Sequence, residues 1–120
     1  MSGEFTHIEI PADDTGKARA FWSALFGWSF DEVPGPSEYH MAPIAEGQSA
    51  AIMTMEAGKR GTRSYFVVDD INAGAATVNE LGGSANDVQP VPGMGWFSIC
   101  TDPAGNEFGL SQNDPSALQP

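Results

Sequence analysis

The chain has 120 residues, which is enough for one domain with a buried core and too few for two independent domains. Sixteen acidic residues against five basic ones give a formal net charge of -11, which excludes the cationic surfaces that nucleic acids and anionic membranes require. Hydrophobic residues make up 41% of the chain, yet no apolar run approaches the roughly 20 residues of a membrane span, so we expect a packed globule.

The start of the chain, Met1 to Glu4, has no basic segment followed by an apolar one, as a secretory signal would. Cys100 is the single cysteine and has no partner for an internal disulfide. Both features predict a cytoplasmic protein in which Cys100 is a small buried residue of a strand.

The sequence contains one pattern twice. A shift of 56 positions aligns residues 5–14 with residues 61–70 and residues 25–27 with residues 81–83, without a gap. Both copies read strand, Asp-Asp, helix and glycine. We therefore predict two related units, with an aspartate capping each helix at its start and Gly27 and Gly83 ending the helices.

The first helix carries an apolar stripe at helical spacing, which predicts a face buried in the core. Its members are Ala18, Phe21, Trp22, Leu25 and Phe26.

Each helix precedes three short strand-like runs that are separated by glycine, proline and asparagine turns. The runs are residues 28–33, 38–43 and 50–56 in the first half, and residues 84–91, 96–101 and 107–111 in the second. The predicted fold is an α+β domain of two βαβββ repeats with eight strands. We place repeat one at 4–57, a linker at 58–61, repeat two at 62–111 and a loose tail at 112–120.

Alternation along the strands separates a face toward the helices from an open face. Ile8, Ile10, Phe66, Phe108 and Leu110 are expected to face the helices. We also assign Phe97 and Ile99 to that side. The residues expected on the open face are Phe5, His7, Glu9, His40, Ala51, Met53, Met55, Arg63, Tyr65, Val67, Trp96, Ser98, Cys100, Glu107, Gly109 and Ser111.

Three segments resemble a known superfamily: residues 5–14, residues 20–28 and residues 102–110. Together with the duplication they look like the vicinal oxygen chelate superfamily, which includes glyoxalases, bleomycin resistance proteins and dioxygenases. Within it, the chain is most similar to bacterial predicted enzymes related to lactoylglutathione lyase. The resemblance implies a curved eight-stranded sheet that forms a cup, helices on its outer face, and a homodimer.

Metal enzymes of this superfamily hold a divalent ion with four side chains, one from the first and one from the last strand of each repeat. By resemblance, these positions fall on His7, Met53, Arg63 and Gly109. A thioether, a guanidinium and a glycine are poor or impossible ligands for such an ion. We therefore predict no metal and no other cofactor. The alternative is a divalent metal on the non-standard set His7, Glu9 and His40.

The expected ligand pocket lines the open face. It comprises His7, Glu9, Met53, Arg63, Tyr65, Trp96 and Glu107, with His40 and Met55 as further candidates. His7 and Glu9 emerge on one face of a strand, where they line the pocket, perform acid–base chemistry or form a structural network. Arg63 anchors an anionic ligand or pairs with Glu9 or Glu107. Tyr65, Trp96 and the methionines suit a pocket wall or a core equally well.

The first functional hypothesis is a metal-independent protein that binds a small aromatic or carboxylate-bearing molecule. The second is a metal-dependent lyase or dioxygenase of the same superfamily. A third is an interaction module without a ligand. The sequence names no substrate.

Overall fold

A computed structural model describes residues 3–54 and 61–118. The chain divides into two compact units, a first unit of Thr6–Arg63 and a second unit of Met1–Phe5 with Ser64–Pro120. Most of the expected linker and the pocket candidate Met55 lie outside the described residues. Neither described helix is long and apolar enough to cross a membrane.

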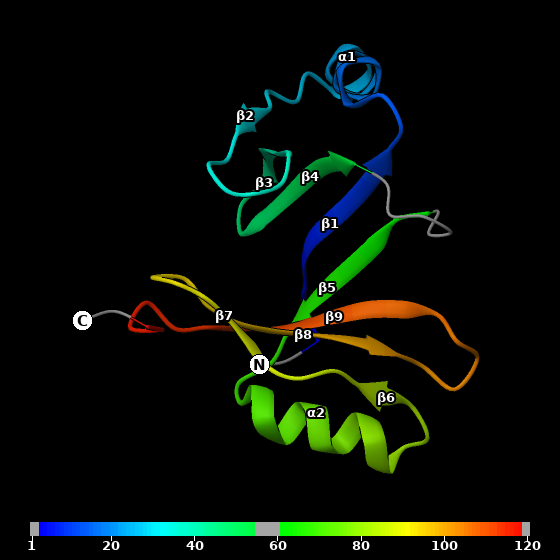
Figure 1. The fold of residues 1–120 in the computed structure, drawn as a ribbon, viewed down its shortest axis with the longest axis vertical. Coiled ribbons are helices and arrows are strands. Elements are labelled where there is room, and N and C mark those ends of the chain that lie inside the picture. Colours follow the sequence, from blue (N-terminus) through cyan, green and yellow to red (C-terminus); the bar gives the residue numbers. More distant parts are fainter. Residues whose placement is uncertain (1–2, 55–60, 119–120) are drawn as a thin grey trace. The chain divides into compact units, whose positions relative to one another are not determined.

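The first unit is a four-stranded sheet with one helix (Figure 1). The strand order is β2-β3-β4-β1, in which β1 runs parallel to β4 and β3 runs antiparallel to both of its neighbours. Its elements are β1 (Phe5–Ala12), α1 (Thr15–Phe26), β2 (Asp31–Glu32), β3 (Tyr39–Ala45) and β4 (Gln48–Thr54).

The second unit repeats this plan, with the order β5-β9-β8-β6 and the short β7 also paired to β8. Its elements are β5 (Arg63–Val67), α2 (Ile71–Glu80), β6 (Ser84–Ala85), β7 (Gln89–Val91), β8 (Gly95–Thr101) and β9 (Glu107–Asn113). The predicted α+β fold of two βαβββ repeats is thus confirmed. The expected strand 84–91 is divided into β6 and β7, and just after β6 the Asn86 carbonyl accepts the Ser98 hydroxyl at 2.8 Å.

The capping aspartates are confirmed. Asp14 accepts the Lys17 N–H at 3.0 Å, and Asp70 accepts the Ala73 N–H at 3.1 Å. Gly27 ends α1 in the left-handed region, with φ of 74°. After α2, Gly82 rather than Gly83 takes that conformation, with φ of 94°.

The expectation that the stripe of α1 is buried is wrong for most of its members. Phe21, Leu25 and Phe26 are 59%, 55% and 56% exposed, and Thr15 is the buried residue of the helix. The rings of α1 contact each other and Trp28, which stacks on Trp22 at 5.5 Å between centroids. The core of the second unit follows the prediction better, since Ile71, Cys100 and Leu110 cluster beside Phe108.

The expected loose tail is ordered from residue 112 to residue 118. Strand β9 continues to Asn113, and the Asp114 N–H donates to the Met94 carbonyl at 2.9 Å. Ala117 is buried, and its carbonyl accepts from the Gly93 N–H at 2.9 Å. Backbone hydrogen bonds to a distant turn therefore hold this segment.

Candidate functional site

The register of the first unit places a polar group on one sheet face, here called the open face of the first unit. His7 lies opposite Ser49, Glu9 opposite Ala51, and Tyr39 opposite Met53. Directly paired residues point to the same side of a sheet. The sequence-based assignment of His7, Glu9 and Met53 to one face is therefore confirmed, and Tyr39 and Ser49 join them.

A chain of hydrogen bonds connects this face. Ser49 Oγ lies 2.6 Å from His7 Nδ1, and His7 Nε2 lies 2.8 Å from the Tyr39 hydroxyl. The Tyr39 hydroxyl donates to Glu9 Oε2 at 2.8 Å, and Arg63 Nη1 donates to Glu9 Oε1 at 2.9 Å. We call these five side chains the open-face network.

The geometry places a proton on Nε2 of His7. Tyr39 donates its proton to Glu9, so its oxygen accepts from His7 Nε2–H. Burial lowers the pKa of His7 below its ordinary value of about 6.5, while the nearby Glu9 charge opposes the shift. Burial therefore favours the neutral form of the His7 imidazole.

Glu9 and Arg63 form a largely buried ion pair. Their side chains are 13% and 23% exposed. Of the outcomes considered for Arg63, pairing with Glu9 is confirmed. A buried charge is costly without a partner, and in this pair each side chain supplies the opposite charge that the other needs.

The residues at the expected metal positions do not fit a divalent ion. Both ring nitrogens of His7 have hydrogen-bond partners, and Arg63 brings a permanent positive charge to the same network. At Gly109, an added Cβ would overlap the ring of Tyr65. Across residues 3–54 and 61–118, no three His, Cys, Asp or Glu side chains form a group able to hold a metal.

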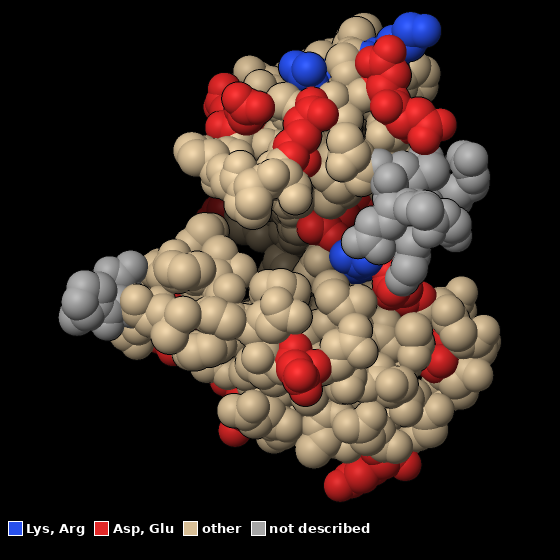
Figure 2. Space-filling model, in the orientation of Figure 1, with Lys and Arg blue, Asp and Glu red and all other residues tan. Residues whose placement is uncertain are grey.

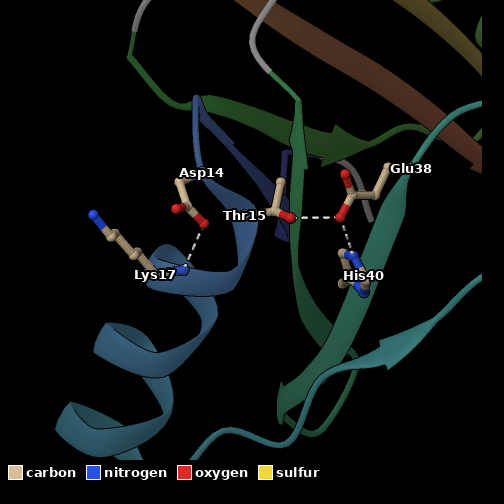
Figure 3. Close-up of polar contacts among 5 residues, drawn as sticks. All are labelled: Asp14, Thr15, Lys17, Glu38 and His40. Carbon is tan, nitrogen blue, oxygen red and sulfur yellow. Dashed lines mark hydrogen bonds and ion pairs between the residues drawn. The ribbon is translucent and has the colours of Figure 1, made fainter.

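The prediction that His40 shares a face with His7 is wrong. His40 pairs with Ile52, which is one residue out of phase with the open face, and it is buried. Glu38 Oε2 lies 2.8 Å from His40 Nε2 and also accepts the hydroxyl of Thr15 at the start of α1 (Figure 3). These hydrogen bonds lower the pKa of Glu38. The bond from Thr15 has the larger effect and the bond with His40 the second largest. The alternative ligand set His7, Glu9 and His40 is therefore divided between two faces.

In the second unit, Tyr65 pairs with Gly109 and lies on the side expected for it. Glu107 shares that side by alternation along β9. Whether Tyr65 and Glu107 contact a ligand stays a prediction.

The assignment of Trp96 to the open face is wrong. Trp96, Ser98 and Cys100 lie on the helix side, and Phe97 and Ile99 on the other. Trp96 packs on the core of the second unit, and its Nε1–H donates to Asp114 at 3.0 Å. Both faces of β8 carry apolar side chains, Trp96 and Cys100 on one and Phe97 and Ile99 on the other, so the pattern does not distinguish the two faces.

Sequence reasoning also missed Tyr39 and Ser49. The expectation that His40 lies on the open face has the alternation of strand 38–43 out of phase by one residue, and in the structure Tyr39 takes that face instead. The signal that points the other way is the pairing partner: Met53 was assigned correctly, and Tyr39 lies opposite it.

Comparison with known proteins gives consistent matches. The profile of the glyoxalase-like domain family covers residues 7–111. CFP32 of Mycobacterium tuberculosis, a proposed glyoxylase, is 32% identical over an alignment of 116 positions that covers 88% of this chain and 44% of CFP32. The chain thus spans less than half the length of that relative. A glyoxylase-like domain-containing protein of Didymella fabae is 31% identical over 92% of this chain and 94% of its own length.

Among solved structures, a glyoxalase/bleomycin resistance protein/dioxygenase superfamily member from Vibrio splendidus 12B01 has a TM-score of 0.67. The match covers 88% of this chain and 96% of that one at 15% identity. At this identity the likeness concerns the fold.

Proposed function

The chain belongs to the glyoxalase-like domain family, within the vicinal oxygen chelate superfamily, and from that premise we propose that it binds a small organic molecule without a metal ion. The single observation that carries this proposal is the open-face network. The network joins the ion pair of Glu9 and Arg63 to an imidazole and a phenol. These groups lie on the same sheet face as the apolar side chains of Met53 and Ala51. A few convergent polar groups on an apolar wall are typical of ligand sites.

The network also suggests which ligands are favoured. Arg63 brings a guanidinium with several N–H groups, whereas the charge of Glu9 is already compensated by Arg63. A carbonyl or carboxylate oxygen therefore finds donors here at lower cost than a cation does. We propose an aromatic or otherwise apolar compound that carries such a group.

A second candidate is acid–base catalysis on the same ligand. The Tyr39 hydroxyl bridges His7 and Glu9, which provides a path for a proton between an imidazole and a carboxylate. In this mechanism Tyr39 exchanges a proton with the ligand. The protonation state of His7 determines whether Tyr39 donates or accepts that proton. Turnover of a retained compound distinguishes catalysis from binding.

Equilibrium dialysis against a metabolite extract, followed by mass spectrometry of the retained compounds, tests the proposal. Wild type should retain one compound class that the Tyr39→Phe and Glu9→Gln variants lose. Thr77→Val is the control, because it removes a hydroxyl that bonds the Ala73 carbonyl within α2. Equal retention by all variants would place the ligand elsewhere.

Metal independence has its own measurement. Elemental analysis of protein purified without chelators should find substoichiometric zinc, nickel, iron and manganese. A stoichiometric metal that survives gel filtration would overturn this part of the proposal. We further propose a cytoplasmic location, which fractionation of the source cells would check.

A further inference from the structure

A groove runs along α1 of the first unit, away from the open-face network. Its volume is about 570 Å³, within the range of small-molecule sites. The small residues Gly16 and Ala20, the rings of Trp28 and Phe30, and Arg19 are among the residues that line it. The open-face network contributes no residue to it.

Arg19 is the unusual member of this groove. In the part of the chain that the structure describes, its Nε is the one buried side-chain nitrogen or oxygen without a hydrogen-bond partner. An unsatisfied buried donor costs about 1–3 kcal/mol. An anion that engages the guanidinium in a two-pronged contact would recover this cost, because the planar fork matches a carboxylate.

Two of the five basic residues of the chain, Lys17 and Arg19, lie on α1. At the top of Figure 2, Lys or Arg side chains lie among Asp and Glu side chains, so the positive charge in this region is local to Arg19 and Lys17. The carboxylate of Glu38 is near enough to Arg19 for their charges to interact. Its Oε2 is engaged by the Thr15 hydroxyl and by His40.

The aromatic wall is held in place by ring contacts. Trp28 stacks on Trp22 with planes 5° apart, lies 5.0 Å from Phe26 between centroids, and meets Phe30 edge-on at 6.3 Å. A wall fixed in this way offers a flat apolar surface at little entropic cost to the complex.

We infer that the groove binds a small anion with a flat apolar body, such as an aromatic carboxylate. The carboxylate engages Arg19, and the ring packs on Trp28 and Phe30. This site is distinct from the one in the proposed function and requires none of its residues.

Benzoate is the probe, and titration followed by ¹H–¹⁵N NMR is the measurement. Benzoate should shift the amides of residues 16–30, whereas the neutral isostere benzamide should not. Arg19→Gln should weaken benzoate binding about 10-fold or more, as expected for a lost hydrogen bond to a charged group. Lys17→Gln removes the same charge from the same helix outside the groove and should change affinity by less than about 2-fold.

Arg19→Lys distinguishes the fork from the charge, because lysine keeps the charge and loses the planar geometry. It should restore only part of the affinity. Tyr39→Phe should bind benzoate like wild type, even if it abolishes retention in the dialysis experiment. The inference is overturned if Arg19→Gln binds as tightly as wild type, or if the shifts appear at His7 and Glu9 instead.

Discussion

At position 109 the missing side chain has a structural reason. The ring of Tyr65, which lies opposite on β5, occupies the space that a Cβ would need. A glutamate at this position would therefore have to displace a buried tyrosine before it reached any ligand. The sequence lacks a ligand side chain at position 109, and the packing of Tyr65 leaves no space for one.

Gly109→Ala should destabilise the fold by about 1–3 kcal/mol, because it overpacks a filled site. Urea unfolding measures the change. Gly35→Ala is the control, since nothing lies within 4 Å of its added Cβ, and it should change stability by less than about 0.5 kcal/mol. Equal effects of the two changes would mean that Tyr65 does not fill this space.

His7 should make stability depend on pH. Because burial lowers its folded-state pKa, the unfolded chain takes up the proton first as the pH falls below about 6.5. The contribution of His7 is thus fully present above that pH and declines below it. Unfolding free energies of wild type and His7→Gln, measured between about pH 5 and 8, should diverge in slope below about pH 6.5. Parallel curves would contradict a lowered pKa.

At the scale of elements, side-chain contacts join the start of α1 to β3. Thr15 follows the capping Asp14, and its hydroxyl donates to Glu38, which also holds His40 (Figure 3). Helix start and buried histidine are thereby fixed through one carboxylate. This explains why His40 lies on the inner face although its strand is polar at that end.

Thr15→Val should raise the pKa of Glu38 toward its ordinary value, because the hydrogen bond from Thr15 is the largest cause of its lowering. NMR titration of the Glu38 carboxyl carbon measures this. Thr77→Val, a hydroxyl deletion in α2, should leave the Glu38 titration unchanged. No movement in Thr15→Val would show that the contact is absent in solution.

At the scale of the whole molecule, the apolar surface of α1 bears on assembly. Phe21 and Leu25 lie one turn apart on a side of the helix away from the groove residues Gly16 and Ala20, and both are more than half exposed. Exposed apolar patches of this kind mark interaction surfaces. We propose that they contribute to a homodimer.

Light scattering should report twice the 12.7 kDa chain mass at micromolar concentration. Leu25→Glu should shift the equilibrium toward monomer, because it places a charge in an apolar contact. Leu81→Glu, at the exposed end of α2, is the matched control and should leave the dimer intact. A wild-type monomer would refute the proposal.

Local features of the sequence determined much of this protein. The duplicated strand, Asp-Asp and helix pattern predicted two βαβββ units and both helix caps. The alternation in β1 placed His7 and Glu9 on one face and Ile10 on the other. These features depend on backbone periodicity within one element, which a short stretch of sequence contains.

Tertiary structure alone decided which face of β3 and β8 is inside, and with it the roles of Tyr39, His40 and Trp96. It also decided that the aromatic stripe of α1 packs largely on Trp28. Alternation yields two faces but does not say which one a helix covers; register against neighbouring strands does. Where apolar residues occur on both faces of a strand, the sequence pattern fits either face toward the core almost equally well. Only the packing against neighbouring elements then determines which face is buried.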